Sequence, residues 1–298
     1  MATEANGKER MCFICDRKPR VPGDVACRSC LQEHRKCYEC GENDRNFPFK
    51  LCSSCYAAHT AQASGRGIVA VPAVQPPLRS GAGLIRINGD QQTYKEVSEH
   101  FVKEWVKMTT EFPNPPQPEA IFAVQNTKLV EAFHHYGAKL RKESSAESAN
   151  SDLFFHGTAL KCDLKNTNEY CFDRDCGICG ISQNGFDASR IGENIPRFKR
   201  FGHGIYLAPN SSKCHDYTQG VPEYGTRAQL LCLVACGAQY ELLHDSTSLQ
   251  QPPSQYHSVY GKSGGSLNYD EIVVYDVGAV LPQYVVLYKH NGVHKIAS

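Results

Sequence analysis

Cysteine is the residue type whose spacing most clearly predicts chemistry in this sequence. Twelve of the fifteen cysteines fall into three sets of four, and most of the twelve form C-x-x-C pairs. Four thiolates bind Zn²⁺ tetrahedrally, and a two-residue gap lets both thiolates of a pair reach one metal ion. Secreted chains use paired cysteines as disulfides, whereas close sets of four are typical of metal sites in a reducing compartment. Zinc is therefore the first cofactor that we expect.

The first two sets lie in residues 11–60 and repeat one spacing, C-x2-C-x11-C-x2-C, after 25 residues. An internal repeat of this kind favours two sequential zinc modules, although spacing alone leaves interleaved ligation open. The expected ligands are Cys12, Cys15, Cys27 and Cys30 for one site and Cys37, Cys40, Cys52 and Cys55 for the other.

The charge of this segment does not indicate DNA binding. Residues 1–60 carry ten Lys or Arg and eight Asp or Glu, and each Zn(Cys)₄ centre would add about two negative charges. A basic footprint for nucleic acid is therefore absent, and we expect a structural or protein-binding role. The whole chain, with 32 basic and 31 acidic residues, likewise gives no charge signal for nucleic acid or a membrane.

The third set has the spacing C-x8-C-x4-C-x2-C and lies in a polar insertion, residues 162–179. We predict a structural Zn²⁺ that clamps this loop, with His203 or His215 as a possible substitute for one ligand. The expected ligands are Cys162, Cys171, Cys176 and Cys179. In contrast, Cys232 and Cys236 lie in an apolar run and are expected to be core residues.

Composition divides the chain into four parts. We expect a flexible tail over residues 1–10, the zinc modules over 11–60, a flexible Ala/Gly/Ser/Pro-rich linker over 61–83, and one larger domain over 84–292. The N-terminus shows no apolar signal region, and no apolar run reaches the ~18 residues of a membrane helix. We therefore expect an intracellular protein, nuclear or cytoplasmic, without a membrane partner.

The larger domain has an α+β pattern. Thr93 and Glu96 form a capping-box pattern before one amphipathic helix, which should end before Phe112, and a second helix is expected from about Asn126. Short β-branched and apolar runs then recur at 153–155, 204–208, 229–234, 272–275 and 284–288, which predicts a mostly antiparallel β core. Neither a dinucleotide-binding G-x-G-x-x-G nor a P-loop is present.

Three segments in this domain carry polar and aromatic residues at strand ends. They are Phe154-Phe-His-Gly-Thr158, Phe201-Gly-His-Gly-Ile-Tyr-Leu-Ala208 with Ser211-Ser-Lys-Cys-His-Asp-Tyr217, and Tyr269-Asp-Glu-Ile-Val-Val-Tyr-Asp276. Each segment alone is explained by an ordinary strand-end histidine, a core aromatic or a solvated glutamate. Their order and combination need another explanation.

Together these segments resemble the catalytic signature of the poly(ADP-ribose) polymerase family, whose His-Tyr-Glu set falls on His156, Tyr206 and Glu271. The similarity extends over roughly residues 114–290 and includes Val124-Gln-Asn126 and Gly185-Phe-Asp187. It implies an ADP-ribosyltransferase fold, with two mainly antiparallel sheets and flanking helices around a cleft for NAD⁺. The small zinc-stabilised N-terminal module would precede it.

The resemblance also implies roles for single residues. Breaking the nicotinamide–ribose bond passes through an oxocarbenium-like state, which a nearby carboxylate stabilises. Glu271 would be that carboxylate, bonded to the nicotinamide ribose. His156 would hold the adenosine ribose, and the backbone of Gly157 would contact the nicotinamide carboxamide. Thr158 would also bind the cofactor, and Tyr217 and Tyr206 would flank the nicotinamide ring. Arg190 is a candidate on the adenosine side.

One position departs from the family. Where many relatives have a serine for the nicotinamide carboxamide, this chain has Cys214, and a thiol is a weak hydrogen-bond donor. We therefore expect looser binding of nicotinamide and its mimics.

The resemblance predicts an NAD⁺-dependent transferase acting on a protein or nucleic-acid acceptor of unknown identity. Because the segment before His156 is short for a large helical regulatory domain, we favour mono- or short-chain ADP-ribosylation without activation by DNA breaks. Two alternatives stay open. One is a non-catalytic zinc scaffold that binds NAD⁺ or ADP-ribose, and the other is an NAD⁺ glycohydrolase.

Overall fold

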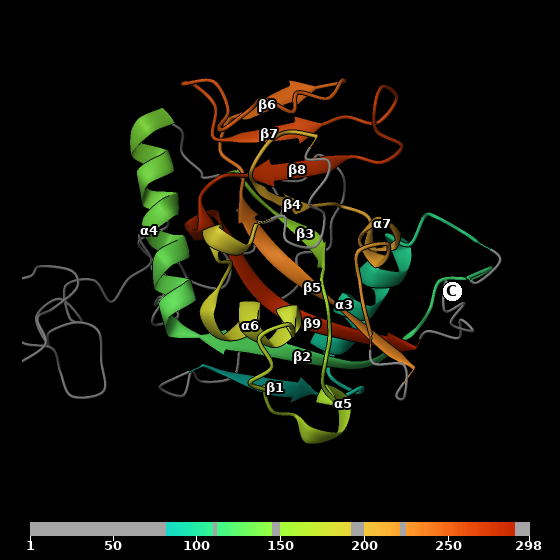
Figure 1. The fold of residues 1–298 in the computed structure, drawn as a ribbon. Coiled ribbons are helices and arrows are strands. Elements are labelled where there is room, and N and C mark those ends of the chain that lie inside the picture. Colours follow the sequence, from blue (N-terminus) through green and yellow to red (C-terminus); the bar gives the residue numbers. More distant parts are fainter. Residues whose placement is uncertain (1–81, 110–111, 145–149, 192–199, 221–224, 290–298) are drawn as a thin grey trace, which may run out of the picture. The chain divides into compact units, whose positions relative to one another are not determined.

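The computed structural model describes residues 82–109, 112–144, 150–191, 200–220 and 225–289. Within these ranges the chain forms two β-sheets with flanking helices, as the α+β expectation required (Figure 1). The predicted tail and zinc modules, and the predicted linker as far as residue 81, lie outside the described residues, so those predictions stay untested. The last two predicted linker residues, Ala82 and Gly83, begin a strand.

The larger sheet has five strands in the order β1-β2-β9-β5-β3, and every neighbouring pair is antiparallel. Three of its strands carry almost unbroken runs of buried residues, because both faces of the sheet are covered. The strands are β1 (Ala82–Ile87), β2 (Pro118–Asn126), β3 (Ser151–Gly157), β5 (Thr226–Ala235) and β9 (Val280–Lys289).

The smaller sheet has four strands in the order β4-β8-β7-β6. Its pairs are antiparallel except β6 with β7, which is parallel. The strands are β4 (Ile205–Leu207), β6 (Gln239–Leu242), β7 (Ser258–Gly261) and β8 (Glu271–Val274). Tyr206 lies in β4 and Glu271 begins β8, so these two residues of the family signature belong to neighbouring strands of one sheet.

A two-residue bridge joins the sheets. The amide of Phe155, near the end of β3, donates to the carbonyl of Ala208 at 2.8 Å, and the amide of Ala208 donates back at 3.0 Å. This bridge brings the end of β3 beside β4, so residues that follow Phe155 and residues of β4 face a common space.

Helices cover the larger sheet on both faces. Helix α3 (Gln92–Lys103) buries Val97 and Phe101 in an aromatic core with Phe155 and Tyr288. Helix α6 (Gly177–Asn184) contacts β1, β2, β5 and β9 and lies in front of this sheet in Figure 1, with α3 behind it. Helix α4 (Thr127–Ser144) runs alongside as the second predicted helix, and it packs against β5 and β9.

The remaining helices are short. They are α5 (Leu164–Thr167), α7 (Ser211–His215) and the 3₁₀ turns η1 (Ala188–Arg190) and η3 (Val277–Ala279). None of these was expected from periodicity, because one or two turns are too short to show a period of 3.6 residues.

The capping-box expectation at Thr93 was wrong. The helix begins one residue earlier, Gln91 is its N-cap without a side-chain cap bond, and Thr93 is buried inside the first turn. The side chain of Gln91 instead accepts from the amide of Asn88 at 2.8 Å. Burial of Thr93 against the sheet therefore outweighed its capping propensity.

Candidate functional site

A pocket of about 780 Å³ opens where β3 ends beside β4. This volume lies within the roughly 300–1,000 Å³ typical of small-molecule sites. All of the non-metal site residues predicted from the sequence line it, namely His156, Gly157, Thr158, Arg190, Tyr206, Cys214, Tyr217 and Glu271. Segments far apart in the chain thus converge on one cavity.

His156 is fixed at the wall of this pocket by its ring nitrogen. Its Nδ1 lies 2.9 Å from the carbonyl oxygen of Tyr206, and because a carbonyl can only accept, Nδ1 must carry the proton. Burial lowers the pKa of His156, so the ring is neutral near pH 7 and Nε2 is an acceptor. The rings of Phe186 and His156 pack edge-to-face, with 4.9 Å between their centroids. Such a histidine can accept a hydrogen bond from a ligand hydroxyl.

Two tyrosines present their rings to the pocket in different ways. The hydroxyl of Tyr206 accepts from the amide of Phe201 at 2.9 Å and donates to the carbonyl of Gly202 at 2.8 Å. Burial raises the pKa of Tyr206 to about 12, so this hydroxyl stays neutral. Tyr217 is 42% exposed, which leaves its ring available to a planar ligand.

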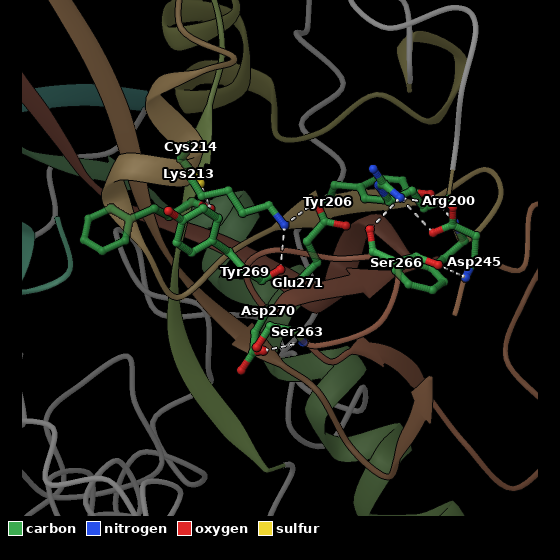
Figure 2. A network of polar contacts seen from close by, with 12 residues as sticks. Arg200, Tyr206, Lys213, Cys214, Asp245, Ser263, Ser266, Tyr269, Asp270 and Glu271 are labelled. Atoms are coloured by element: carbon green, nitrogen blue, oxygen red, sulfur yellow. Dashed lines mark hydrogen bonds and ion pairs between the residues drawn. The ribbon is translucent and has the colours of Figure 1, made fainter. Parts of the chain in front are cut away.

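Glu271, at the start of β8, is held by a buried lysine. The Nζ of Lys213 lies 2.6 Å from Oε1 of Glu271, and the two side chains are only 9% and 7% exposed. Lys213 also donates to the carbonyl of Tyr269 at 3.0 Å, and Figure 2 shows Lys213 and Glu271 pointing toward one another. Burial lowers the pKa of Lys213, and the Glu271 carboxylate partly opposes that shift.

The two carboxylate oxygens of Glu271 differ in their contacts. Oε2 is buried and makes no hydrogen bond with any part of the chain that the structure describes. Since an unmatched carboxylate oxygen costs free energy, a ligand hydroxyl that donates to it would be favoured. Sequence patterns singled out Glu271 but not Lys213, although the Ser-Lys-Cys order was visible.

Lys213 and Cys214 are positioned by α7, which helix α3 and the segment after it hold in place. Ser211 donates to the carbonyl of Phe101 at 2.7 Å, and the hydroxyl of Ser212 accepts from the amides of residues 106 and 107 at 3.1 and 3.0 Å. These bonds make the first predicted helix a support of the pocket.

Cys214 is buried at the pocket wall, and burial raises the pKa of its thiol to about 12. The sulfur donates to the carbonyl of Phe155 at 3.1 Å. Its one proton is therefore used within the protein.

Gly157 lies against the same turn. A Cβ built on Gly157 would come 1.9 Å from the carbonyl oxygen of Cys214 and 3.2 Å from Cβ of Tyr217. Only glycine allows β3 and α7 to approach this closely.

Arg190 also lines the pocket and belongs to the 3₁₀ turn that follows α6 in the chain. Its guanidinium donates to the carbonyl of Arg174 at 2.8 Å, and Asp187 caps the same 3₁₀ turn through Ser189. A second arginine of the pocket, Arg200, pairs with Asp245 at 2.9 Å and donates to the carbonyl of Ser266 at 3.1 Å (Figure 2). Sequence patterns did not single out Arg200, although it also lines the pocket.

The third cysteine set comes together as expected. The sulfurs of Cys162, Cys171, Cys176 and Cys179 all lie within 4.8 Å of one another and could hold a metal ion. Two backbone amides point at them, Lys161 to Cys176 at 3.3 Å and Cys171 to Cys179 at 3.5 Å. Amides directed at sulfur are typical of thiolate metal sites.

The histidines proposed as substitute ligands do not join this cluster. His215 contacts the hydroxyl of Tyr288 at 2.8 Å, and His203 contacts the carbonyl of Ala188 at 3.1 Å. Cys232 and Cys236 are fully buried core residues, as predicted. The eight N-terminal cysteines lie outside the described residues.

Comparison with known proteins agrees with this geometry. Residues 91–266, more than half of the chain, match the poly(ADP-ribose) polymerase catalytic domain. The chain therefore belongs to this family, and family membership implies NAD⁺ as a substrate. His156, Tyr206 and Tyr217 lie inside the matched segment, and Glu271 lies just beyond it.

Two relatives are much longer than this chain. Human protein mono-ADP-ribosyltransferase PARP4 is 32% identical over 96 residues, which cover 30% of this chain and 6% of the relative. The mouse protein of the same name is 26% identical over 159 residues, covering 50% of this chain and 7% of the relative. The likeness thus concerns a small part of those proteins.

None of the helices in the described ranges is long and apolar enough to cross a lipid bilayer.

Proposed function

We propose that this chain is an NAD⁺-dependent ADP-ribosyltransferase that cleaves the nicotinamide glycosidic bond and transfers ADP-ribose to an acceptor. The observation that carries the proposal is Glu271, a buried carboxylate whose Oε1 is fixed by Lys213 and whose Oε2 has no hydrogen-bond partner among the described residues. It shares one pocket with His156 and Tyr217. A carboxylate placed in this way can accept from a ribose hydroxyl and oppose the positive charge that develops as nicotinamide leaves.

The other pocket residues fit the two ends of NAD⁺. The neutral Nε2 of His156 would accept from the adenosine ribose, with Thr158 beside it and Arg190 on the adenosine side. The backbone of Gly157 would contact the nicotinamide carboxamide. Tyr217 would stack on the nicotinamide ring opposite Tyr206, a contact worth about 0.5–1.5 kcal/mol beyond burial. The tied hydroxyl of Tyr206 fits a ring-positioning role.

We propose a mono- or short-chain product. The two relatives are named mono-ADP-ribosyltransferases, which supports a single transfer. Incubation with labelled NAD⁺ followed by gel analysis should give short products that do not depend on DNA. Long polymers that form only with nicked DNA would refute this part.

The decisive experiment compares the wild type with Glu271→Gln, because glutamine keeps the shape and removes the charge. We expect NAD⁺ turnover to fall by about 100-fold or more, the scale of losing one preorganised electrostatic group. Mass spectrometry of both protein and small molecules separates ADP-ribosylated acceptor from free ADP-ribose. Undiminished turnover in Glu271→Gln would refute the role of Glu271, and free ADP-ribose as the sole product would identify a glycohydrolase.

We also propose Zn²⁺ as the metal of the Cys162, Cys171, Cys176 and Cys179 cluster. Four thiolates at this spacing suit a closed, structural zinc site, with Zn–S bonds of about 2.3 Å. The two N-terminal zinc modules remain proposals from spacing alone, with protein rather than DNA as their expected partner.

A further inference from the structure

Helix α6 carries part of the cysteine cluster and also forms a wall of the pocket. Cys176 is its N-cap residue and Cys179 lies in its first turn. Four other residues of the same helix line the pocket: Gly177, Gly180, Ile181 and Asn184. The cluster and the pocket therefore share one short element.

This helix needs support from outside itself. It has eight residues, and Gly177 and Gly180 fall in its first turn. The side chain of its N-cap residue, Cys176, makes no capping hydrogen bond. Helices shorter than about 12 residues are marginal alone, and each interior glycine costs about 1 kcal/mol relative to alanine. At its C-terminal end, Asn126 donates to the carbonyl of Gln183 at 2.6 Å. The N-terminal end is instead held at the cysteine cluster.

The cluster joins α6 to two other segments. Cys162 continues the segment that leaves β3 through the pocket residues Thr158 and Lys161, and its sulfur lies 3.6 Å from that of Cys179. Cys171 belongs to the loop that precedes α6. Its backbone carbonyl accepts a hydrogen bond from the side chain of Gln183 at 3.3 Å. A metal bound here would tie the start of α6 to the segment after His156.

The helix start has little freedom of position. The amide of Ile178 donates to the carbonyl of Ala159 at 3.1 Å. A Cβ on Gly177 would come 2.1 Å from Oγ1 of Thr158. After the helix, Gly185 leads to Phe186, whose ring contacts His156. A displacement of α6 would therefore move both Thr158 and the aromatic support of His156.

We infer that zinc in this cluster fixes α6 and thereby builds the half of the pocket that receives the ADP-ribose portion of NAD⁺. The nicotinamide half is independent, because Ser211 and Ser212 anchor α7 to Phe101 and to residues 106 and 107 on the opposite side. This inference rests on the proposed NAD⁺ substrate and zinc. Its consequence is that zinc occupancy controls ADP-ribose affinity without changing nicotinamide affinity.

The test uses the full-length chain and measures binding of ADP-ribose and of nicotinamide separately by calorimetry. Cys171→Ala should lose one equivalent of zinc relative to the wild type by elemental analysis. If α6 is then in place in one molecule in ten, ADP-ribose affinity falls about tenfold, whereas nicotinamide affinity changes less than about twofold. Cys171→His, which retains a metal ligand, should restore both zinc and ADP-ribose binding. Cys236→Ser removes a buried thiol outside the cluster and should leave both affinities unchanged.

A second measurement keeps the inference testable if Cys171→Ala does not fold. In Cys171→His, zinc occupancy can be varied with a buffered series of free Zn²⁺, and ADP-ribose affinity should rise with occupancy while nicotinamide affinity stays level. Equal changes in both affinities, or zinc loss with unchanged ADP-ribose binding, would overturn the inference.

These readouts do not involve turnover, so the inference and the proposed reaction fail separately. A wild type that does not turn over NAD⁺ but binds ADP-ribose in a zinc-dependent way would refute the proposed reaction and support the inference. A wild type that binds neither ligand would overturn both.

Discussion

The ammonium of Lys213 lies 2.6 Å from one carboxylate oxygen of Glu271, in a pair that is almost fully buried. Lys213 lies on α7, beside the large sheet, and Glu271 begins β8 of the small sheet. A buried ion pair gives little net stability, because desolvation offsets most of the attraction. Its value here is geometric, since it fixes the Glu271 carboxylate at the wall of the pocket.

Replacing Lys213 by glutamine should therefore reduce turnover more than NAD⁺ binding. We expect kcat to fall by about 10-fold or more with KM changed by less than about threefold, the pattern of an interaction needed mainly in the transition state. Steady-state NAD⁺ consumption measures both constants. Lys262→Gln breaks a solvent-exposed pair with Glu241 and is the matched control. A rise in KM alone would show that Lys213 serves binding instead.

Cys214→Ser should tighten the binding of nicotinamide and its mimics. The thiol proton is donated to the carbonyl of Phe155, whereas a hydroxyl is the stronger donor and can turn toward a carboxamide. One net hydrogen bond of about 1 kcal/mol corresponds to roughly a fivefold gain in affinity. Calorimetry with nicotinamide measures this, with Cys236→Ser as the control. Unchanged affinity would remove the thiol as the explanation for loose binding.

Gly157→Ala should weaken ligand binding at the nicotinamide end. The added methyl group would meet the backbone carbonyl of Cys214, which a side-chain rotation cannot relieve. We expect nicotinamide affinity to fall by about 10-fold or more, together with a loss of stability of about 1–3 kcal/mol from overpacking. Gly89→Ala is the control, because a Cβ there meets no atom within 4 Å. Equal binding by both variants would contradict the tight approach of β3 and α7.

His100 should make folding sensitive to mild acid. It lies in the last turn of α3, its ring stacks on Phe155 with 5.2 Å between the ring centroids, and burial lowers its pKa from 6.5 to about 4. The unfolded chain then binds a proton that the folded chain does not. Stability is therefore level above pH 6.5 and falls as the pH drops toward 4, by roughly 3 kcal/mol at most.

Chemical denaturation of the wild type and His100→Leu between pH 7 and pH 4.5 tests this. The free energy of unfolding should fall less steeply in His100→Leu, because the buried titrating group is gone. His135→Leu removes an exposed histidine of α4 and serves as the comparison. Parallel curves for the wild type and His100→Leu would exclude His100 as the cause.

Local sequence patterns predicted the elements with clear hydrophobic runs. Strands β3, β5, β8 and β9 and helix α4 fall where apolar runs or helical periodicity predicted them. Strands β1 and β2 were missed, because residues 82–87 mix charged, glycine and apolar residues, and residues 118–126 adjoin a predicted helix start. Their strand character comes from pairing with β9 and with one another.

The resemblance of three sequence segments to a family signature identified His156, Tyr206 and Glu271 as a set, and residue type and spacing identified Cys162 with its three partners as another. These identifications needed no coordinates, because a chemical site restricts which side chains can serve in it. The tertiary structure alone decided that Lys213 fixes Glu271, that the Cys214 proton goes to Phe155, and that α6 connects the cysteines to the pocket. Hydrogen bonds and ion pairs depend on distances of a few ångströms between segments remote in the chain, which local patterns do not encode.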